Sequence, residues 1–207
     1  MTADKQTLDV YAAKRDDYVR TMDAQSDDPR LTAFIAALPR GAHALDLGCG
    51  PGWAAAQMAE AGLTVTATDA APEMVELASQ IAGVTARVAS FDDITETDAY
   101  DGIWANFSLL HATRADMPRH LAALRRALKP GGLFHIGMKT GEGAHRDALG
   151  RHYTYYTAEE LHALLTDAGF TPFTSHTGTD KGPFYATTVS KHFSGGATDC
   201  GTHNCAL

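Results

Sequence analysis

The chain has 207 residues, of which 44% are hydrophobic and 20% charged. These proportions are typical of a globular protein and exclude a long disordered chain. The 17 Lys and Arg residues against 25 Asp and Glu residues give a net charge of −8, whereas a nucleic-acid-binding protein normally presents a basic surface to phosphates. The length predicts one domain over 1–193, made of a helical segment (1–40) and a core (41–193), with a tail over 194–207.

The sequence predicts a cytoplasmic protein without a membrane segment. It has no run of 18 apolar residues, and its first residues, MTADKQTLDV, lack the apolar stretch of a signal peptide. Cys49, Cys200 and Cys205 are an odd number of cysteines and do not suggest a disulfide framework. Cys200, His203 and Cys205 would still need a fourth ligand for a structural zinc site, so we expect no metal.

Two helices are predicted within residues 1–40. Apolar and long side chains recur at helical spacing in two stripes, and Pro39 and Gly41 end the second. The stripes are Leu8, Tyr11, Arg15, Tyr18 and Met22, and then Leu31, Phe34, Ile35 and Leu38. The first helix either packs a core stripe or covers a ligand, in which case Tyr11 or Tyr18 would reach it.

From residue 43 the chain alternates short β-rich runs with helical periods. Strands are predicted over 43–47, 63–68, 84–89, 102–106 and 133–138, and helices over 53–61, 72–81 and 116–128. This alternation predicts an α/β fold with a mostly parallel sheet. Lys129-Pro130-Gly131-Gly132 is interpreted as the turn that ends the third helix.

The end of the domain predicts one helix and two strands. Thr157 and Glu160 form a capping box for a helix over 157–168, and Gly169 suits its C-terminal end. The β-rich runs 170–175 and 184–191 follow without a helix between them, so we expect them to pair antiparallel.

A glycine-rich loop after the first strand predicts a ligand site. Its sequence is Asp46-x-Gly48-x-Gly50-x-Gly52, and glycine lets a backbone turn sharply and approach a ligand at the start of a helix. The dinucleotide fingerprint would place its third glycine at position 53, where this chain has Trp53. Binding of a nicotinamide dinucleotide is therefore disfavoured.

The loop resembles motif I of the class I S-adenosylmethionine-dependent methyltransferases, and later landmarks follow in that family's order over roughly residues 40–190. The resemblance implies a Rossmann-like, doubly wound, mostly parallel sheet of seven strands with helices on both faces and an antiparallel last strand. It implies S-adenosylmethionine as cofactor and S-adenosylhomocysteine as product. The implied cofactor contacts are Asp46, Gly48, Cys49, Gly50 and Gly52 in the loop, Asp69, Ala70 and Met74 after the second strand, Ser90, Phe91 and Asp92 after the third, and Asn106 and Phe107 after the fourth. The run 150–156 also resembles a group of small bacterial methyltransferases of unassigned substrate.

Several of these residues have a purely structural alternative. Asp46 would hold the glycine loop by accepting backbone N–H bonds, Asp69 would cap the following helix, and either Asp92 or Asp93 would cap a turn. Cys49 would be a small buried residue of the loop.

The acceptor side of the predicted site is less sharply defined. His111 lies in the segment that the family places beside the methionine moiety, so it is a candidate general base, with a pocket or packing role as the alternative. Arg151, Tyr153 and Tyr155 follow the fifth strand, where they either contact the acceptor or pack at a strand edge or helix start. Lys139 either pairs with a carboxylate of the acceptor or is a solvated residue after the strand.

The combined hypothesis is methyl transfer to an O, N or S nucleophile of a small molecule. Asn106-Phe107-Ser108 lacks the Pro-Pro-aromatic run that enzymes methylating base amines or glutamine amides usually carry after Asn or Asp. The alternatives are a module that binds S-adenosylmethionine without transferring its methyl group, and a nicotinamide-dependent oxidoreductase.

Overall fold

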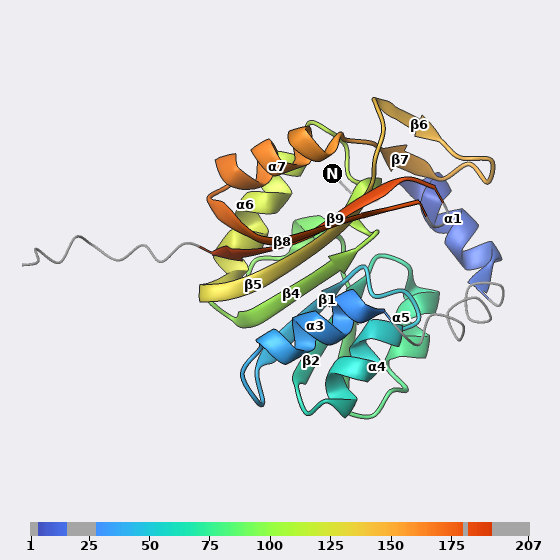
Figure 1. The fold of residues 1–207 in the computed structure, drawn as a ribbon. Helices are drawn as coiled ribbons and strands as arrows, with labels where there is room; N and C mark the ends of the chain where they lie inside the picture. The colour runs from blue at the N-terminus through green and yellow to red at the C-terminus, as the bar shows by residue number, and fades with distance from the viewer. Residues whose placement is uncertain (1–3, 16–27, 180–181, 192–207) are drawn as a thin grey trace, which may run out of the picture.

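The computed structural model describes residues 4–15, 28–179 and 182–191, with no account of the side chains of residues 172 and 173. A seven-stranded sheet forms its centre, in the order β3-β2-β1-β4-β5-β9-β8 (Figure 1). Its strands are β1 (His43–Leu47), β2 (Thr64–Asp69), β3 (Val84–Val88), β4 (Tyr100–Asn106), β5 (Leu128–Lys139), β8 (Phe170–Gly178) and β9 (Phe184–Lys191).

The first five strands of the sheet are parallel, and β9 is antiparallel to both β5 and β8. The predicted antiparallel pair at the end of the domain is therefore confirmed, as is the doubly wound, mostly parallel sheet. Strand β1 lies between β2 and β4, so the strand order reverses beside it. Open α/β sheets bind ligands at the carboxyl ends of the strands at this switch point.

Helices cover both faces of the sheet (Figure 1). One face carries α3 (Pro29–Ala37), α4 (Trp53–Glu60) and α5 (Pro72–Ala78), and the other carries α6 (Met117–Ala127) and α7 (Ala158–Asp167). Two buried apolar clusters result, one including Leu31, Phe34 and Met58 and the other including Leu121 and Leu165. The predicted stripe of the second helix is confirmed, because Leu31 and Phe34 of α3 are buried.

The helix ends follow their sequence signals. The Thr157 side chain accepts a hydrogen bond from the Glu160 N–H, and the Glu160 carboxylate accepts one from the Thr157 N–H, which confirms the capping box of α7. Gly169 follows with φ of 82°. Helix α5 ends earlier than predicted, with Ser79 as its C-terminal cap.

Strand β5 begins earlier than predicted. Leu128 already pairs with Tyr100, but the next pair on this ladder is Leu133 with Gly102, so the residues between them form an irregular bulge. The predicted turn over the Pro-Gly-Gly run is therefore wrong, because the run lies within β5. Extra residues on one strand of a pair are accommodated as a bulge, and here Gly131 adopts φ of 77°.

Two separate segments cover one end of the sheet (Figure 1). One is α1 (Lys5–Ala13), and the other is the two-stranded ribbon of β6 (Ala144–Arg146) and β7 (His152–Thr154). The sequence did not predict this ribbon. Together the two segments are called the cap below. Two short 3₁₀ turns, η2 (Phe91–Asp93) and η3 (Leu109–His111), follow β3 and β4.

Candidate functional site

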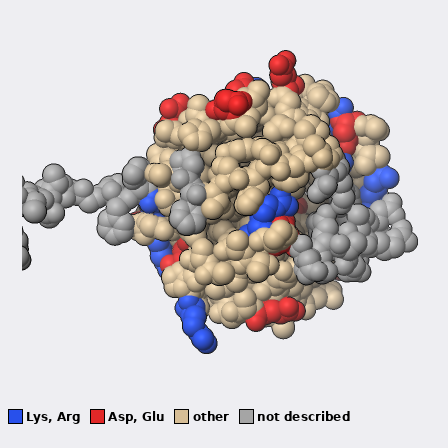
Figure 2. Space-filling view, viewed as in Figure 1, with Lys and Arg blue, Asp and Glu red and all other residues tan. Residues whose placement is uncertain are grey.

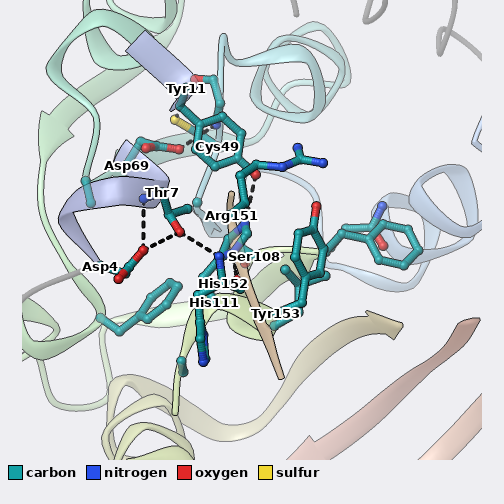
Figure 3. Close-up of a pocket in the computed structure, with 18 of the residues that line it drawn as sticks. Asp4, Thr7, Tyr11, Cys49, Asp69, Ser108, His111, Arg151, His152 and Tyr153 are labelled. Carbon is teal, nitrogen blue, oxygen red and sulfur yellow. Dashed lines mark hydrogen bonds between the residues drawn. The ribbon is translucent and has the colours of Figure 1, made fainter. Parts of the chain in front are cut away.

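A cavity of about 760 Å³ lies beneath the cap, at the carboxyl ends of β1, β2, β4 and β5. Asp46 and Asp69 reach it from β1 and β2, and Asn106 and Lys139 reach it from β4 and β5. Figure 3 shows labelled residues of α1 and β7 close to His111 and Ser108 of the segment after β4. The switch point predicted from the strand order therefore carries a cavity.

The glycine loop is held to the neighbouring strand by its backbone. The N–H groups of Gly48 and Cys49 both donate to the carbonyl of Thr68, at 2.8 and 2.9 Å. Gly48 has φ of 72°, and a Cβ at this position would lie 2.3 Å from Cβ of Ser108. The loop after β4 therefore packs directly on the glycine loop, which only glycine permits.

Asp69 joins the glycine loop to the start of α5. One carboxylate oxygen accepts from the N–H of Gly50 at 2.9 Å, and the other accepts from the N–H of Ala71 at 2.9 Å. Burial raises the pKa of Asp69, and these N–H groups act in the opposite direction. Each oxygen keeps a further lone pair for a ligand hydroxyl. The structural role and the ligand role of Asp69 are thus compatible.

Asp46 is deeper in the cavity wall. It is 3% exposed and accepts from the N–H of Ala55 at 3.1 Å, which ties β1 to the first turn of α4. Burial raises the pKa of Asp46 to about 7. A buried carboxylate of this kind gains from a cationic ligand, because a nearby positive charge stabilises its ionised form.

Four buried polar atoms of residues on the cavity wall have no hydrogen-bond partner within the described residues. One is Nδ1 of His120, and the other three are Nε1 of Trp53, Oδ1 of Asn106 and Oγ of Ser108. Buried polar groups are almost always paired with protein, water or ligand. The last three leave one donor, one acceptor and one hydroxyl for a polar ligand at this end of the cavity.

The loop after β3 resolves the alternative between two aspartates. Asp93 accepts from the backbone N–H and the hydroxyl of Ser90, both at 2.8 Å, and so caps the turn η2. Asp92 lines the cavity instead and forms an ion pair with Arg119. Phe91 also lines the cavity and lies edge-on to His120 at 5.5 Å between ring centroids.

His111 is held by both of its ring nitrogens. Nδ1 lies 2.7 Å from the carbonyl oxygen of His152, and Nε2 lies 2.8 Å from the hydroxyl of Tyr11 (Figure 3). A carbonyl only accepts, so Nδ1 carries the hydrogen and Nε2 accepts from the tyrosine. Burial lowers the pKa of His111 to about 4 and keeps the imidazole neutral at pH 7.

The two parts of the cap are joined by side chains of α1. Thr7 receives a hydrogen bond from the N–H of His152 at 2.9 Å and donates its own to Asp4 at 2.6 Å (Figure 3). Asp4 also pairs with Arg146 of β6, at 2.9 Å for each oxygen. The guanidinium beside Asp4 holds the pKa of that carboxyl well below its usual range.

The predicted acceptor-side residues meet at the cap. The Arg151 guanidinium lies 5.7 Å from the ring centre of Tyr11 and 5.2 Å from that of Tyr153, and it is paired with Asp147 at 2.5 Å. Tyr155 stacks on His145 at 4.4 Å. Arg151, Tyr153 and Tyr155 all line the cavity, as does Lys139.

Among the described residues, one predicted cofactor residue, Gly52, does not line the cavity. Gly52 precedes α4, and a Cβ there would lie 2.6 Å from the side chain of Ile81, so it permits close packing behind the loop. Tyr18 lies outside the described residues. The remaining predicted residues line the cavity: Tyr11, Asp46, Gly48, Cys49, Gly50, Asp69, Ala70, Met74, Ser90, Phe91, Asp92, Asn106, Phe107 and His111.

Sequence reasoning missed Asp4, Thr7, Ser108 and His152. Asp4, the N-terminal cap of α1, lies seven residues before Tyr11, and Thr7 lies four residues before it. All three therefore lie on the same face of the helix. That helical spacing was available as a signal. No such signal marks His152, because its contacts are made by its backbone carbonyl and N–H and not by its side chain.

In the part of the chain that the structure describes, no helix is long and apolar enough to cross a bilayer, and no group of three or more His, Cys, Asp or Glu residues could hold a metal ion.

Residues 44–132 match a protein-family model described as a methyltransferase domain. Among curated proteins, the chain is 37% identical over 103 residues to a ubiquinone biosynthesis O-methyltransferase of Xanthomonas oryzae pv. oryzae, covering 46% of this chain and 42% of that protein. It is 38% identical over 103 residues to a ubiquinone/menaquinone biosynthesis C-methyltransferase of Rubrivivax gelatinosus, covering 48% and 40%. The matches thus span less than half the length of these relatives.

Solved structures match over most of the chain. The 1,6-didemethyltoxoflavin-N1-methyltransferase of Burkholderia thailandensis, solved with bound 1,6-didemethyltoxoflavin and S-adenosylhomocysteine, is 28% identical with a TM-score of 0.69, covering 88% of this chain and 89% of that one. The [4+2]-cyclase SpnF is 20% identical with a TM-score of 0.67, covering 79% and 81%, which shows a shared fold alone. Residues 44–132 therefore match the methyltransferase domain family, and the chain has the fold of the class I S-adenosylmethionine-dependent methyltransferases.

Proposed function

We propose that the protein binds S-adenosylmethionine and transfers its methyl group to an O, N or S nucleophile of a small molecule. The observation that carries this proposal is the position of Asp69. It ends β2 beside the glycine loop, at the switch point, and its carboxylate faces the cavity. A carboxylate at this place suits the two hydroxyls of a ribose.

The rest of the cavity wall fits the same molecule. Asp46 offers a buried carboxylate for a positive charge, and Trp53, Asn106 and Ser108 offer polar atoms without partners in the described chain. Phe91 and Met74 supply apolar surface for an adenine ring. When bound, S-adenosylmethionine supplies a methyl group that its sulfonium has already activated.

The protein then has mainly to align the acceptor and to exclude water. Positioning of this kind lowers a barrier by about 7–11 kcal/mol, more than a general base usually contributes. The cap provides the means, since α1 and β7 lie over the cavity and are joined through Thr7 and His152. The cavity of about 760 Å³ is large enough for a small acceptor beside the cofactor.

A small acceptor agrees with the charge of the chain. The net charge is −8, and Figure 2 shows the Lys and Arg residues of the visible face lying apart from one another rather than in one patch. We therefore propose that neither nucleic acid nor a membrane is a partner of this protein. We also propose a cytoplasmic location, which cell fractionation would check.

Calorimetry and a transfer assay together test the proposal. We expect saturable binding of S-adenosylmethionine and S-adenosylhomocysteine, and label from methyl-labelled S-adenosylmethionine in at least one member of a panel of phenols, amines and thiols. Binding of a nicotinamide dinucleotide with none of S-adenosylmethionine would favour the oxidoreductase and overturn the proposal. Binding without transfer to any acceptor would favour a binding module, a distinction that matters because the fold also occurs in a [4+2]-cyclase.

A further inference from the structure

His120 is a polar residue on the buried face of α6. The other buried residues of this helix are apolar: Met117, Leu121, Leu124 and Ala127. The imidazole is 5% exposed, and its Nδ1 has no hydrogen-bond partner within the described residues. Buried polar groups are almost always paired, and an apolar ring would serve packing alone. A ligand that reaches His120 would therefore meet a polar group for which the described chain provides no hydrogen bond.

His120 lies beside the surface on which the adenine ring is placed above. It lines the cavity together with Phe91, Asp92 and Met74. The rings of His120 and Phe91 meet edge-on, with centroids 5.5 Å apart. Nδ1 of His120 lies 3.7 Å from Oδ1 of Asp92. The imidazole is thus a polar group at the edge of an otherwise apolar ring site.

The neighbouring charges determine which nitrogen of His120 carries hydrogen. Burial, and then the Arg119 guanidinium, lower the pKa of His120, although Asp92 and Asp116 oppose this, so the imidazole is neutral at pH 7. A neutral imidazole has one N–H and one lone pair. Asp92, which pairs with Arg119, is a carboxylate at this pH. It attracts a hydrogen on Nδ1 and would repel a lone pair there, so Nε2 is left as the hydrogen-bond acceptor.

We propose that His120 recognises the 6-amino group of the adenine ring of the cofactor. Nε2 accepts a hydrogen bond from the amino group, and Asp92 is a positioning residue that keeps the hydrogen of the imidazole on Nδ1. An oxygen at the same place on the ring would bring two lone pairs together. The site should therefore bind adenosine ligands in preference to their inosine counterparts. This inference rests on the proposed binding of S-adenosylmethionine.

The apolar part of the site cannot make this distinction. Phe91 and Met74 offer similar contact to either purine ring, because the two differ only in polar groups at the ring edge. A site that hydrogen-bonds one polar group of a ligand rejects the analogue that lacks it much more strongly than a hydrophobic pocket does. A single acceptor at the ring edge is therefore sufficient to select the amino form.

Calorimetry with two ligands tests the inference. The full chain is titrated with S-adenosylhomocysteine and with S-inosylhomocysteine, its deaminated analogue, and the ratio of the two dissociation constants is recorded. We expect the wild type to bind S-adenosylhomocysteine at least tenfold more tightly. His120→Phe, which keeps a flat ring against Phe91 but has no acceptor, should lower this ratio at least fivefold. His120→Gln, whose side-chain oxygen can replace Nε2, should keep a larger part of it.

His43→Phe is the matched control. His43 is another partly buried histidine, at the start of β1, where it contacts Thr66 and does not line the cavity. We expect this variant to keep the wild-type ratio. A protein whose discrimination falls equally in His43→Phe and His120→Phe would contradict a specific role of His120.

Nitrogen-15 NMR of the imidazole tests the part of Asp92. In the free wild type, we expect the hydrogen of His120 on Nδ1, and in Asp92→Asn a larger share of it on Nε2. In the wild type, S-adenosylhomocysteine should shift the Nε2 resonance more than S-inosylhomocysteine does. A hydrogen on Nε2 in the free wild type would overturn the inference without the need for any variant.

The outcomes separate this inference from the proposed function. If S-adenosylhomocysteine does not bind to the wild type, the proposed methyl transfer is itself overturned. If it binds but the wild type shows no preference over S-inosylhomocysteine, or His120→Phe keeps the full preference, methyl transfer stands and His120 does not read the amino group.

Discussion

The hydroxyl of Tyr11 lies 2.8 Å from Nε2 of His111, although the two residues are 100 positions apart in the chain. Tyr11 belongs to α1 and His111 to the turn after β4, so this contact exists only because the cap folds over the carboxyl ends of the strands. Their ring centres are 5.6 Å apart and nearly perpendicular.

Asp69→Asn should weaken the binding of S-adenosylhomocysteine by about tenfold to a hundredfold, since a hydrogen bond to a charged group contributes about 1.5–3 kcal/mol. The amide oxygen of asparagine can still accept from one of the two backbone N–H groups that Asp69 now serves. Calorimetry measures the change. Asp98→Asn, which removes an exposed carboxylate paired with Lys191, is the control, and an unchanged dissociation constant for Asp69→Asn would remove this residue from the site.

Gly48→Ala should destabilise the protein by more than Gly62→Ala. Both glycines have positive φ, 72° and 86°, so alanine meets a similar backbone penalty of about 1–2 kcal/mol at each. Only at Gly48 would the new Cβ also lie 2.3 Å from Cβ of Ser108, whereas nothing lies within 4 Å at Gly62. Urea unfolding of the two variants isolates the cost of this clash. Equal losses would mean that Ser108 moves aside freely.

Asp46→Asn should stabilise the free protein at pH 8 while weakening its binding of S-adenosylmethionine. The pKa of Asp46 is about 7 in the folded protein against 3.8 as a reference, so the native state holds a proton that the unfolded chain has lost between these values. The free energy of unfolding therefore falls as pH rises through this window. Asparagine does not titrate, so the variant avoids this loss, and its free energy of unfolding at pH 8 should exceed that of the wild type by roughly 1–4 kcal/mol. Urea unfolding at about pH 4 and pH 8 should show a much larger gain for the variant at the higher pH, because the wild type loses stability throughout the window between these two values.

His135→Phe should reduce the loss of stability in mild acid. His135 is 1% exposed and stacks on Trp104 with ring centres 3.8 Å apart, and burial and then the nearby Arg30 guanidinium lower its pKa to about 3, which Asp28 opposes. Between that value and the reference of 6.5, the unfolded chain binds a proton that the native state does not. Stability thus falls as pH falls through this window, by up to about 1.4 kcal/mol per pH unit.

Phenylalanine keeps the stacking and removes the titration. The pH dependence of urea unfolding between about pH 4.5 and 7.5 measures the difference in slope between variant and wild type. Parallel curves would show that His135 is protonated equally in both states. His111 contributes in the same direction as His135, and Asp46 in the opposite one, so only the comparison of variant with wild type is informative.

Most of the central fold could be predicted from local patterns. β1 begins and ends where predicted, and Thr157 with Glu160 caps α7 as the capping box requires. Such signals depend on a few neighbouring residues and on the φ values that they allow. Leu128, by contrast, begins β5 rather than ending a helix, because pairing with Tyr100 outweighs the turn preference of the Pro-Gly-Gly run.

The sequence by itself determined the α/β alternation, the glycine loop and the position of Asp69, since side-chain periodicity and backbone geometry encode all three. Only the tertiary structure decided which groups meet across the cavity. The β6–β7 ribbon, the contact of Thr7 with His152 and the direction of the Tyr11–His111 hydrogen bond join segments distant in sequence. The lowered pKa of His111 likewise follows from burial, which depends on how the whole chain packs and not on the residues beside it.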